Sequence, residues 1–198
     1  MDTENELGSQ GEKPIPSAEF DELLQKETEM LNNFVPTLGS DELQPMMIVL
    51  MEGTGEDGAR KRALLPIQGL TEDADKRQVM AATGAAVAET GVRMVGAFLI
   101  TEAWTKSLSA AEAWRSKAEP VCPSKMADRQ EALLVWGRTV DRRVALAMAP
   151  IQRDETTTRL GDWRIQKCHL ADETESDNLL SHFFLGFLQE WDRRSERQ

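Results

Sequence analysis

The sequence contains no tyrosine and, among 198 residues, only two cysteines and two histidines. With only Cys122 and Cys168, a disulfide framework is not indicated, and two free thiols in a reducing compartment are the simpler expectation. No stretch approaches the roughly 18 consecutive apolar residues that a membrane-spanning helix needs. The polar, acidic start of the chain lacks the basic and apolar regions of a secretory signal. We therefore expect a cytoplasmic protein that makes no membrane contact.

The scarcity of histidine and cysteine also removes the usual metal-binding patterns. None of the spacings C-x-x-C, H-x-H or H-E-x-x-H occurs, and the adjacent residues Cys168 and His169 would point to opposite faces of a strand. There is no G-x-S-x-G nucleophile elbow. His182 stands beside Phe183 and Phe184, where a packed histidine is the commoner role. The sequence predicts no metal, no cofactor and no catalytic residue.

One glycine-rich stretch, GTGEDG at residues 53–58, matches the spacing of a dinucleotide-binding loop. Such a loop opens a helix whose N-terminus holds the pyrophosphate. Here another strand-like run follows, and Glu56 and Asp57 stand where a phosphate would have to lie. A hairpin loop between two strands is the expected structure.

The acidic excess is concentrated near the N-terminus. Residues 1–30 carry nine acidic and two basic side chains, so they supply -7 of the net charge of -11. Residues 1–16, polar and containing two glycines and two prolines, are expected to form a disordered acidic arm. An acidic surface repels phosphate, so direct nucleic-acid binding is not expected. The excess could attract a basic partner or mimic a nucleic acid, but a solubilising surface is the simpler role.

Hydrophobic periodicity predicts one domain over residues 17–194, followed by a frayed end at 195–198. Helical spacing is found from Ser17 to about residue 35, from Thr71 to Gly91, and from Leu179 to Trp191. Strand-length apolar runs are found at 45–51, 60–68, 92–104, 131–137, 142–152 and 162–170. This order predicts an α+β fold: a single, largely antiparallel sheet of about six strands with helices packed on it.

Two of these elements predict how the layers are arranged. The run at 92–104 is mainly apolar on both of its faces, which is typical of a central strand covered on both sides. The last helix has a wide apolar stripe, which must be buried against the sheet or against a partner.

Glu102 is the most informative polar residue, because it stands near the end of the most apolar strand. A carboxylate leaving a core must be hydrogen-bonded or paired. Guanidinium groups that could pair with it lie in neighbouring predicted elements, at Arg129, Arg138, Arg142 and Arg143. Three roles stay open: a structural ion pair with an arginine such as Arg129, contact with a ligand at the mouth of the sheet, or solvent exposure. No second titratable group that would support acid–base catalysis is evident.

The long connection at residues 105–128 contains Trp114, beside Arg115. An exposed tryptophan next to an arginine is a plausible anchor for a protein partner, so Trp114 is the candidate partner-contact residue. The alternative is that Trp114 packs the connection onto the body of the domain.

Three short motifs occur in residues 98–136: TEAW at 101–104, PS at 123–124 and DRQE at 128–131. This stretch resembles a pattern found in a group of uncharacterised bacterial and phage proteins. In that pattern a strand ends in Ser/Thr-Glu-Ala-Trp, a loop contains Pro-Ser, and Asp-Arg-x-Glu precedes the next strand. The resemblance implies a strand–loop–strand unit and a bacterial or phage source. It implies no activity.

These features favour a non-enzymatic cytosolic protein that acts through protein–protein contacts, with a homo-oligomer as one form of it. The alternative is a small-ligand-binding protein or enzyme that uses Glu102 with Arg129. A further alternative is an acidic mimic of nucleic acid.

Overall fold

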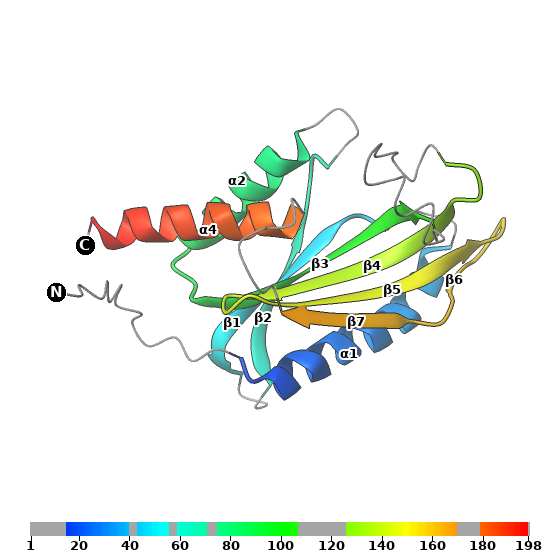
Figure 1. The fold of residues 1–198 in the computed structure, drawn as a ribbon, viewed down its shortest axis with the longest axis horizontal. Coiled ribbons are helices and arrows are strands. Elements are labelled where there is room, and N and C mark those ends of the chain that lie inside the picture. The colour runs from blue at the N-terminus through cyan, green and yellow to red at the C-terminus, as the bar shows by residue number, and fades with distance from the viewer. Residues whose placement is uncertain are drawn as a thin grey trace.

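The computed structural model describes residues 15–39, 43–55, 59–70, 75–106, 126–169 and 179–197. These residues form a single antiparallel sheet, curled as a half-barrel, with helices packed on both of its faces (Figure 1). The predicted α+β class and the antiparallel sheet are confirmed.

The helical elements are α1 (Ser17–Phe34), the 3-10 turn η1 (Val35–Leu38), α2 (Lys76–Glu89) and α4 (Leu179–Ser195). The strands are β1 (Met46–Thr54), β2 (Arg60–Pro66), β3 (Met94–Thr105), β4 (Gln130–Thr139), β5 (Arg143–Arg153), β6 (Thr158–Leu160) and β7 (Arg164–His169). The strands pair in the order β2-β1-β3-β4-β5-β6, and β7 also pairs with β5. The two expected hairpins, β1–β2 and β4–β5, are both antiparallel.

Two elements differ from the prediction. The second helix begins at Lys76 rather than near Thr71, because the Asp75 side chain accepts hydrogen bonds from the N–H groups of Arg77 and Gln78. Thr71 itself lies outside the described residues. Strand β6 was not predicted, since three residues are too short to show a period.

Helix α1 covers one face of the sheet, which we call the α1 face. Phe20 stacks on Phe98 of β3, with ring centroids 5.2 Å apart. The core on this face contains Phe20, Leu23, Leu24 and Leu31 of α1 with Ile48, Leu50, Phe98, Ile100, Leu133, Val135, Ala145 and Ala147 of the sheet. Ile15, at the end of the predicted arm, is also fully buried here; residues 1–14 lie outside the described residues.

Helices α2 and α4 cover the opposite face, which we call the α2–α4 face. Their apolar residues, among them Met80, Phe183 and Phe187, meet Met47, Val49, Ala97 and Leu99 of the sheet. Strand β3 is therefore buried on both faces from Met94 to Ile100, as its sequence predicts, while Trp104 near its end is exposed. Most of the apolar stripe of the last helix is buried against the sheet, while Leu185 and Leu188 stay exposed.

Ion pairs join α1 to the strands on either side of it, β2 and β7. Toward β2, Glu19 accepts two hydrogen bonds of 2.7 Å from Arg60, and Glu27 contacts Arg62. Toward β7, Lys167 lies 2.6 Å from Asp21. Much of the acidic excess of the first helix is thus used in holding that helix on the sheet.

The most deeply buried of these acids is Glu27, whose side chain is 1% exposed. Burial raises the pKa of Glu27, and the pairing with Arg62 offsets only part of that rise. A folded pKa above the unfolded value means that Glu27 favours folding at low pH and that this contribution is lost as the pH rises through the folded pKa.

Glu27→Gln is therefore expected to leave stability at pH 7 unchanged or to raise it by up to about 1 kcal/mol, because the buried charge is removed while the shape is kept. It should also flatten the fall in stability between about pH 4.5 and pH 7. Thermal unfolding across that range measures both effects. Glu19→Gln, in the more exposed pair with Arg60, is the matched control and should lower stability by less than about 1 kcal/mol. A clear loss at pH 7 in Glu27→Gln would contradict this reading.

Candidate functional site

Glu102 lies on the α1 face of β3, beyond the apolar core. Its Oε1 atom accepts a hydrogen bond of 2.8 Å from the Leu43 N–H and lies 2.6 Å from Nη2 of Arg153. Leu43 lies in the connection between η1 and β1, so its hydrogen bond to Glu102 holds that connection in place. Arg153 is the last residue of β5. Glu102 is therefore a largely but not fully buried carboxylate, 13% exposed, with two partners within the chain.

Arg153 is the centre of a wider network at this end of the sheet. Its Nε donates to Glu131 Oε2 at 3.0 Å, and its Nη1 donates to Thr158 Oγ1 at 3.3 Å. The Thr158 hydroxyl in turn donates to the carbonyl oxygen of Gly39. One guanidinium thus joins β3, β4, β5 and β6, and through Thr158 it reaches the end of η1.

The electrostatics of the network fit a structural ion pair. Burial raises the pKa of Glu102, while the Leu43 N–H and Arg153 pull the pKa in the opposite direction. Burial lowers the pKa of Arg153, but hydrogen bonds to Glu131 and Glu102 outweigh it and raise the value above normal. The guanidinium stays charged between two carboxylates, which are held by contacts within the chain.

The arginine that meets Glu102 is Arg153, which sequence reasoning missed, and not Arg129. The Arg129 guanidinium lies 4.4 Å from the centre of the Trp104 ring, and Trp104 is partly exposed. The hairpin register could have pointed to Arg153: Arg138 pairs with Val144, and continuing that ladder places Arg153 at the same end of the sheet as Glu102. Trp114, the candidate partner-contact residue, lies outside the described residues.

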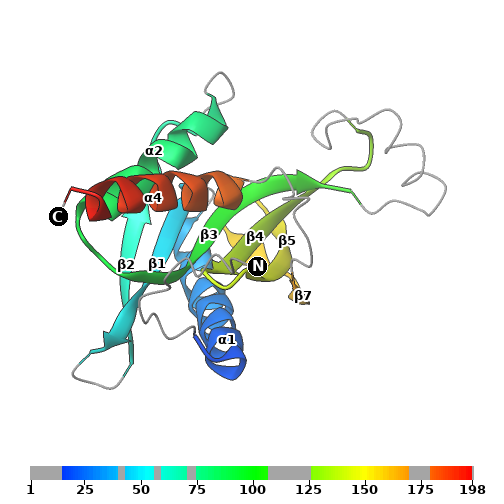
Figure 2. The same ribbon diagram turned by 60° about the vertical axis from the view of Figure 1, so that its left-hand side comes forward.

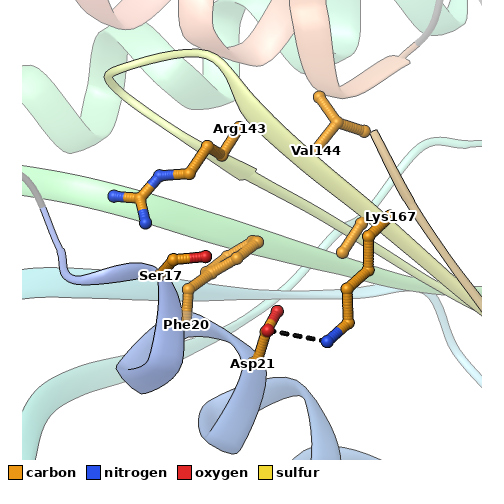
Figure 3. A pocket seen from close by; sticks show the side chains of 7 residues that line it. Ser17, Phe20, Asp21, Arg143, Val144 and Lys167 are labelled. Atoms are coloured by element: carbon orange, nitrogen blue, oxygen red, sulfur yellow. Dashed lines mark hydrogen bonds and ion pairs between the residues drawn. The ribbon is translucent and has the colours of Figure 1, made fainter. Parts of the chain in front are cut away.

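A cavity of about 170 Å³ lies between the start of α1 and the paired strands β5 and β7. Figure 3 shows Arg143 and Lys167 on either side of Ser17 and Phe20, with Lys167 bonded to Asp21. Arg143 pairs with Asp141 at 2.9 Å and also donates to the carbonyl oxygen of Ile15. Because each cation already has a carboxylate partner, this cavity is best explained as the place where the start of α1 is fastened to the sheet.

A larger groove, of about 450 Å³, lies between α1 and the β1–β2 hairpin. We call the boundary between α1 and β2 the α1–β2 seam. The groove is lined by Glu19, Glu22, Leu23, Lys26, Gly55, Ala59, Arg60 and Arg62. Its charged residues pair with one another or with Glu27, as in the Glu22–Lys26 contact of 2.8 Å.

Exposed apolar side chains follow these ion pairs along both α1 and β2. Glu19 meets Arg60 and Glu27 meets Arg62, so α1 and β2 advance in the same direction along the seam. At about 100° per residue, Met30 and Phe34 fall on the same side of α1 as these two glutamates. Leu64 is the next residue after Arg62 on the same face of β2. We call Met30, Phe34 and Leu64 the seam patch; they are 36%, 39% and 61% exposed.

The described residues contain no group of three or more side chains placed to hold a metal ion, and none of their helices is long and apolar enough to cross a membrane. The TEAW motif ends β3 and the DRQE motif leads into β4, while residues 123–124 lie outside the described ranges. No family model, curated protein or solved structure matches this chain.

Proposed function

We propose that this protein acts in the cytoplasm through contacts with other proteins, rather than by catalysing a reaction, and that the seam patch is its contact surface. The observation that carries the proposal is the exposure of Met30, Phe34 and Leu64 beside a strand at the edge of the sheet. Scattered exposed apolar residues are ordinary on protein surfaces, whereas apolar side chains gathered in one place are typical of contact sites.

The chemistry of the acidic residues supports a binding role over catalysis. Glu102, the carboxylate best placed to do chemistry, is hydrogen-bonded to Leu43 and paired with Arg153. A general acid or base must be free to reach the proton that it transfers. The ion pair instead braces the end of the sheet.

The same reasoning weakens the role of a nucleic-acid mimic. A mimic needs acidic side chains that face outward at phosphate-like spacing. In α1, Glu19, Asp21 and Glu27 are instead held by basic residues of β2 and β7. Their charge is largely neutralised within the fold.

A pair of double variants tests the proposal. Phe34→Asn with Leu64→Asn makes the seam patch polar, while Leu185→Asn with Leu188→Asn makes the same change on the outer face of α4. The wild-type chain is immobilised on a resin, and extract of the organism that encodes it is passed over the resin to capture a partner. Light scattering of the purified chain across concentration reports any self-association. We expect the seam variant to retain a partner, or a second copy, about tenfold less well, and the α4 variant to behave as wild type.

Two results would count against the proposal. A wild-type chain that is monomeric at every concentration and retains no protein would remove the contact function itself. Loss of the partner in the α4 variant alone would place the contact on α4. Thermal unfolding of both variants establishes that the fold is kept.

A further inference from the structure

We infer that β2 accepts an extended, acidic and apolar segment of a partner protein as an additional strand of the sheet. The inference rests on the proposed function, because the occupant is part of another protein. It adds the mode of binding and the chemistry of the segment that binds.

The first observation is the open side of β2. Figure 2 shows β2 at the outer edge of the sheet, and β2 is the first strand in the pairing order. The Ile67 N–H donates to the Pro45 carbonyl at 2.8 Å, so Ile67 faces β1. Bonding direction alternates along an antiparallel strand, so Arg62 and Leu64 turn their N–H and C=O groups away from β1. Within the described ranges, no strand pairs with this side of β2.

The second observation is the charge along this edge. Arg60, Lys61 and Arg62 follow one another in a chain whose net charge is -11. On the α1 face, Glu19 forms an ion pair with Arg60 and Glu27 forms one with Arg62. The Arg62 side chain is still 52% exposed. Lys61 points to the other face, is exposed, and forms no ion pair with a described residue. Arg60 and Arg62 are paired with acids of α1, so the positive charge that this edge offers to a partner is that of Lys61 and of the half-exposed Arg62 guanidinium.

This charge decides between the possible occupants. Pairing β2 with β2 of a second copy would bring like charges together across the new ladder, which is destabilising. A lysine on an edge strand also disfavours pairing with the edge strands of unrelated chains. Pro66 has no N–H, so the outward-facing N–H groups of β2 end at Leu64. A partner strand with acidic side chains meets the cationic edge favourably.

The third observation is the seam patch beside the open edge. A strand added along β2 would alternate its side chains between the two faces of the sheet. On the α1 face it would pass Arg62 and then Leu64. Met30 and Phe34 lie on the side of α1 that carries Glu27, the partner of Arg62. An acidic residue followed two positions later by an apolar one matches this face, and an acidic residue matches Lys61 on the other. This is strand addition, in which main-chain bonds supply affinity and alternate side chains supply specificity.

The test uses two fluorescent peptides of about eight residues, the length of an ordinary strand. In one, pairs of glutamates alternate with pairs of valines, so that each face carries a glutamate followed two positions later by a valine; in the other, lysine replaces every glutamate. Fluorescence anisotropy with the full chain is expected to show that the glutamate peptide binds at least about tenfold more tightly and that added salt weakens its binding. Equal binding of the two peptides, or no binding of the glutamate peptide, would overturn the inference.

Variants locate the binding on β2. Leu64→Pro removes an N–H that faces away from β1, so the hairpin keeps its own hydrogen bonds. Lys61→Glu reverses the exposed charge, and Lys76→Glu, at the start of α2 and outside β2, makes the same change in net charge. We expect the first two to weaken the glutamate peptide about tenfold and Lys76→Glu to bind as wild type.

Unchanged binding in both β2 variants would overturn the inference; should Leu64→Pro fail to fold, Lys61→Glu decides alone. The proposed function has a separate outcome. A chain that retains its partner through the seam patch but not the glutamate peptide keeps that function and loses strand addition. A chain that retains neither loses both.

Discussion

Replacing Gly186 with alanine is expected to destabilise the protein by about 3 kcal/mol or more, although alanine normally stabilises a helix by about 1 kcal/mol over glycine. A Cβ atom at Gly186 of α4 would lie 1.9 Å from the carbonyl oxygen of Ala81 in α2 and 2.6 Å from its carbonyl carbon. These are backbone atoms, so the two helices would have to separate. Gly84 of α2 faces the same crossing, because its Cβ would lie 2.0 Å from the carbonyl oxygen of Phe183.

Gly161→Ala is the matched control for the helix crossing. The atoms nearest to a Cβ at Gly161 belong to the Pro150 side chain, at an ordinary contact distance of 3.4 Å. This substitution should leave stability unchanged or raise it by up to about 1 kcal/mol, because alanine restricts the unfolded chain. Urea unfolding of the two variants measures the difference. If Gly186→Ala were as stable as Gly161→Ala, the close approach of α2 and α4 would be wrong.

Arg153→Met is expected to cost about 3 kcal/mol at pH 7. The substitution leaves Glu102 and Glu131 charged and close together without the guanidinium that joins them. Burial already raises the pKa of Glu102, and loss of Arg153 would raise it further. A raised folded pKa means that the penalty is present above that pKa and is relieved as the pH falls through it. The cost should therefore be smaller at pH 5 than at pH 7.

Two further variants separate the network from its surroundings. Glu102→Gln keeps an oxygen that can accept from the Leu43 N–H, so it should cost only about 1 kcal/mol. In the double variant, Glu102→Gln should restore part of the stability lost in Arg153→Met, since the unpaired buried charge is gone. Arg129→Met serves as the control for loss of an arginine at the same end of the sheet. An equal loss of stability in Arg129→Met and Arg153→Met would contradict the central role of Arg153 in the network.

The elements of this fold could be predicted from sequence because their signals are local. The run at 92–104 is apolar on both faces, and β3 is buried on both. The three-residue strand β6 has no period to detect, and its place is fixed by pairing with β5 at the other end of a turn. In that turn, Asp154 accepts hydrogen bonds from the N–H groups of Thr156 and Thr157, which lowers its pKa to about 2.

The candidate sites show the limit of local patterns more clearly. That Glu102 would need a partner followed from the cost of burying a carboxylate. That the partner is Arg153 depends on two strand registers, which are tertiary facts. The seam patch was not foreseen, because Leu64 lies more than 30 residues from Met30 in the chain and each residue alone reads as ordinary core. The close crossing at Gly84 and Gly186 has the same origin, since either glycine by itself only weakens a helix.

The most direct test is hydrogen exchange of the backbone amides, measured with and without the protein that the wild-type chain retains. In the free chain the amides of Arg62 and Leu64 face away from β1 and should exchange quickly, while Ala63 and Leu65 are protected. Binding is predicted to protect Arg62 and Leu64, together with the end of α1 around Phe34. Protection confined to the surroundings of Glu102, with Arg62 and Leu64 unchanged, would contradict a contact function at the α1–β2 seam.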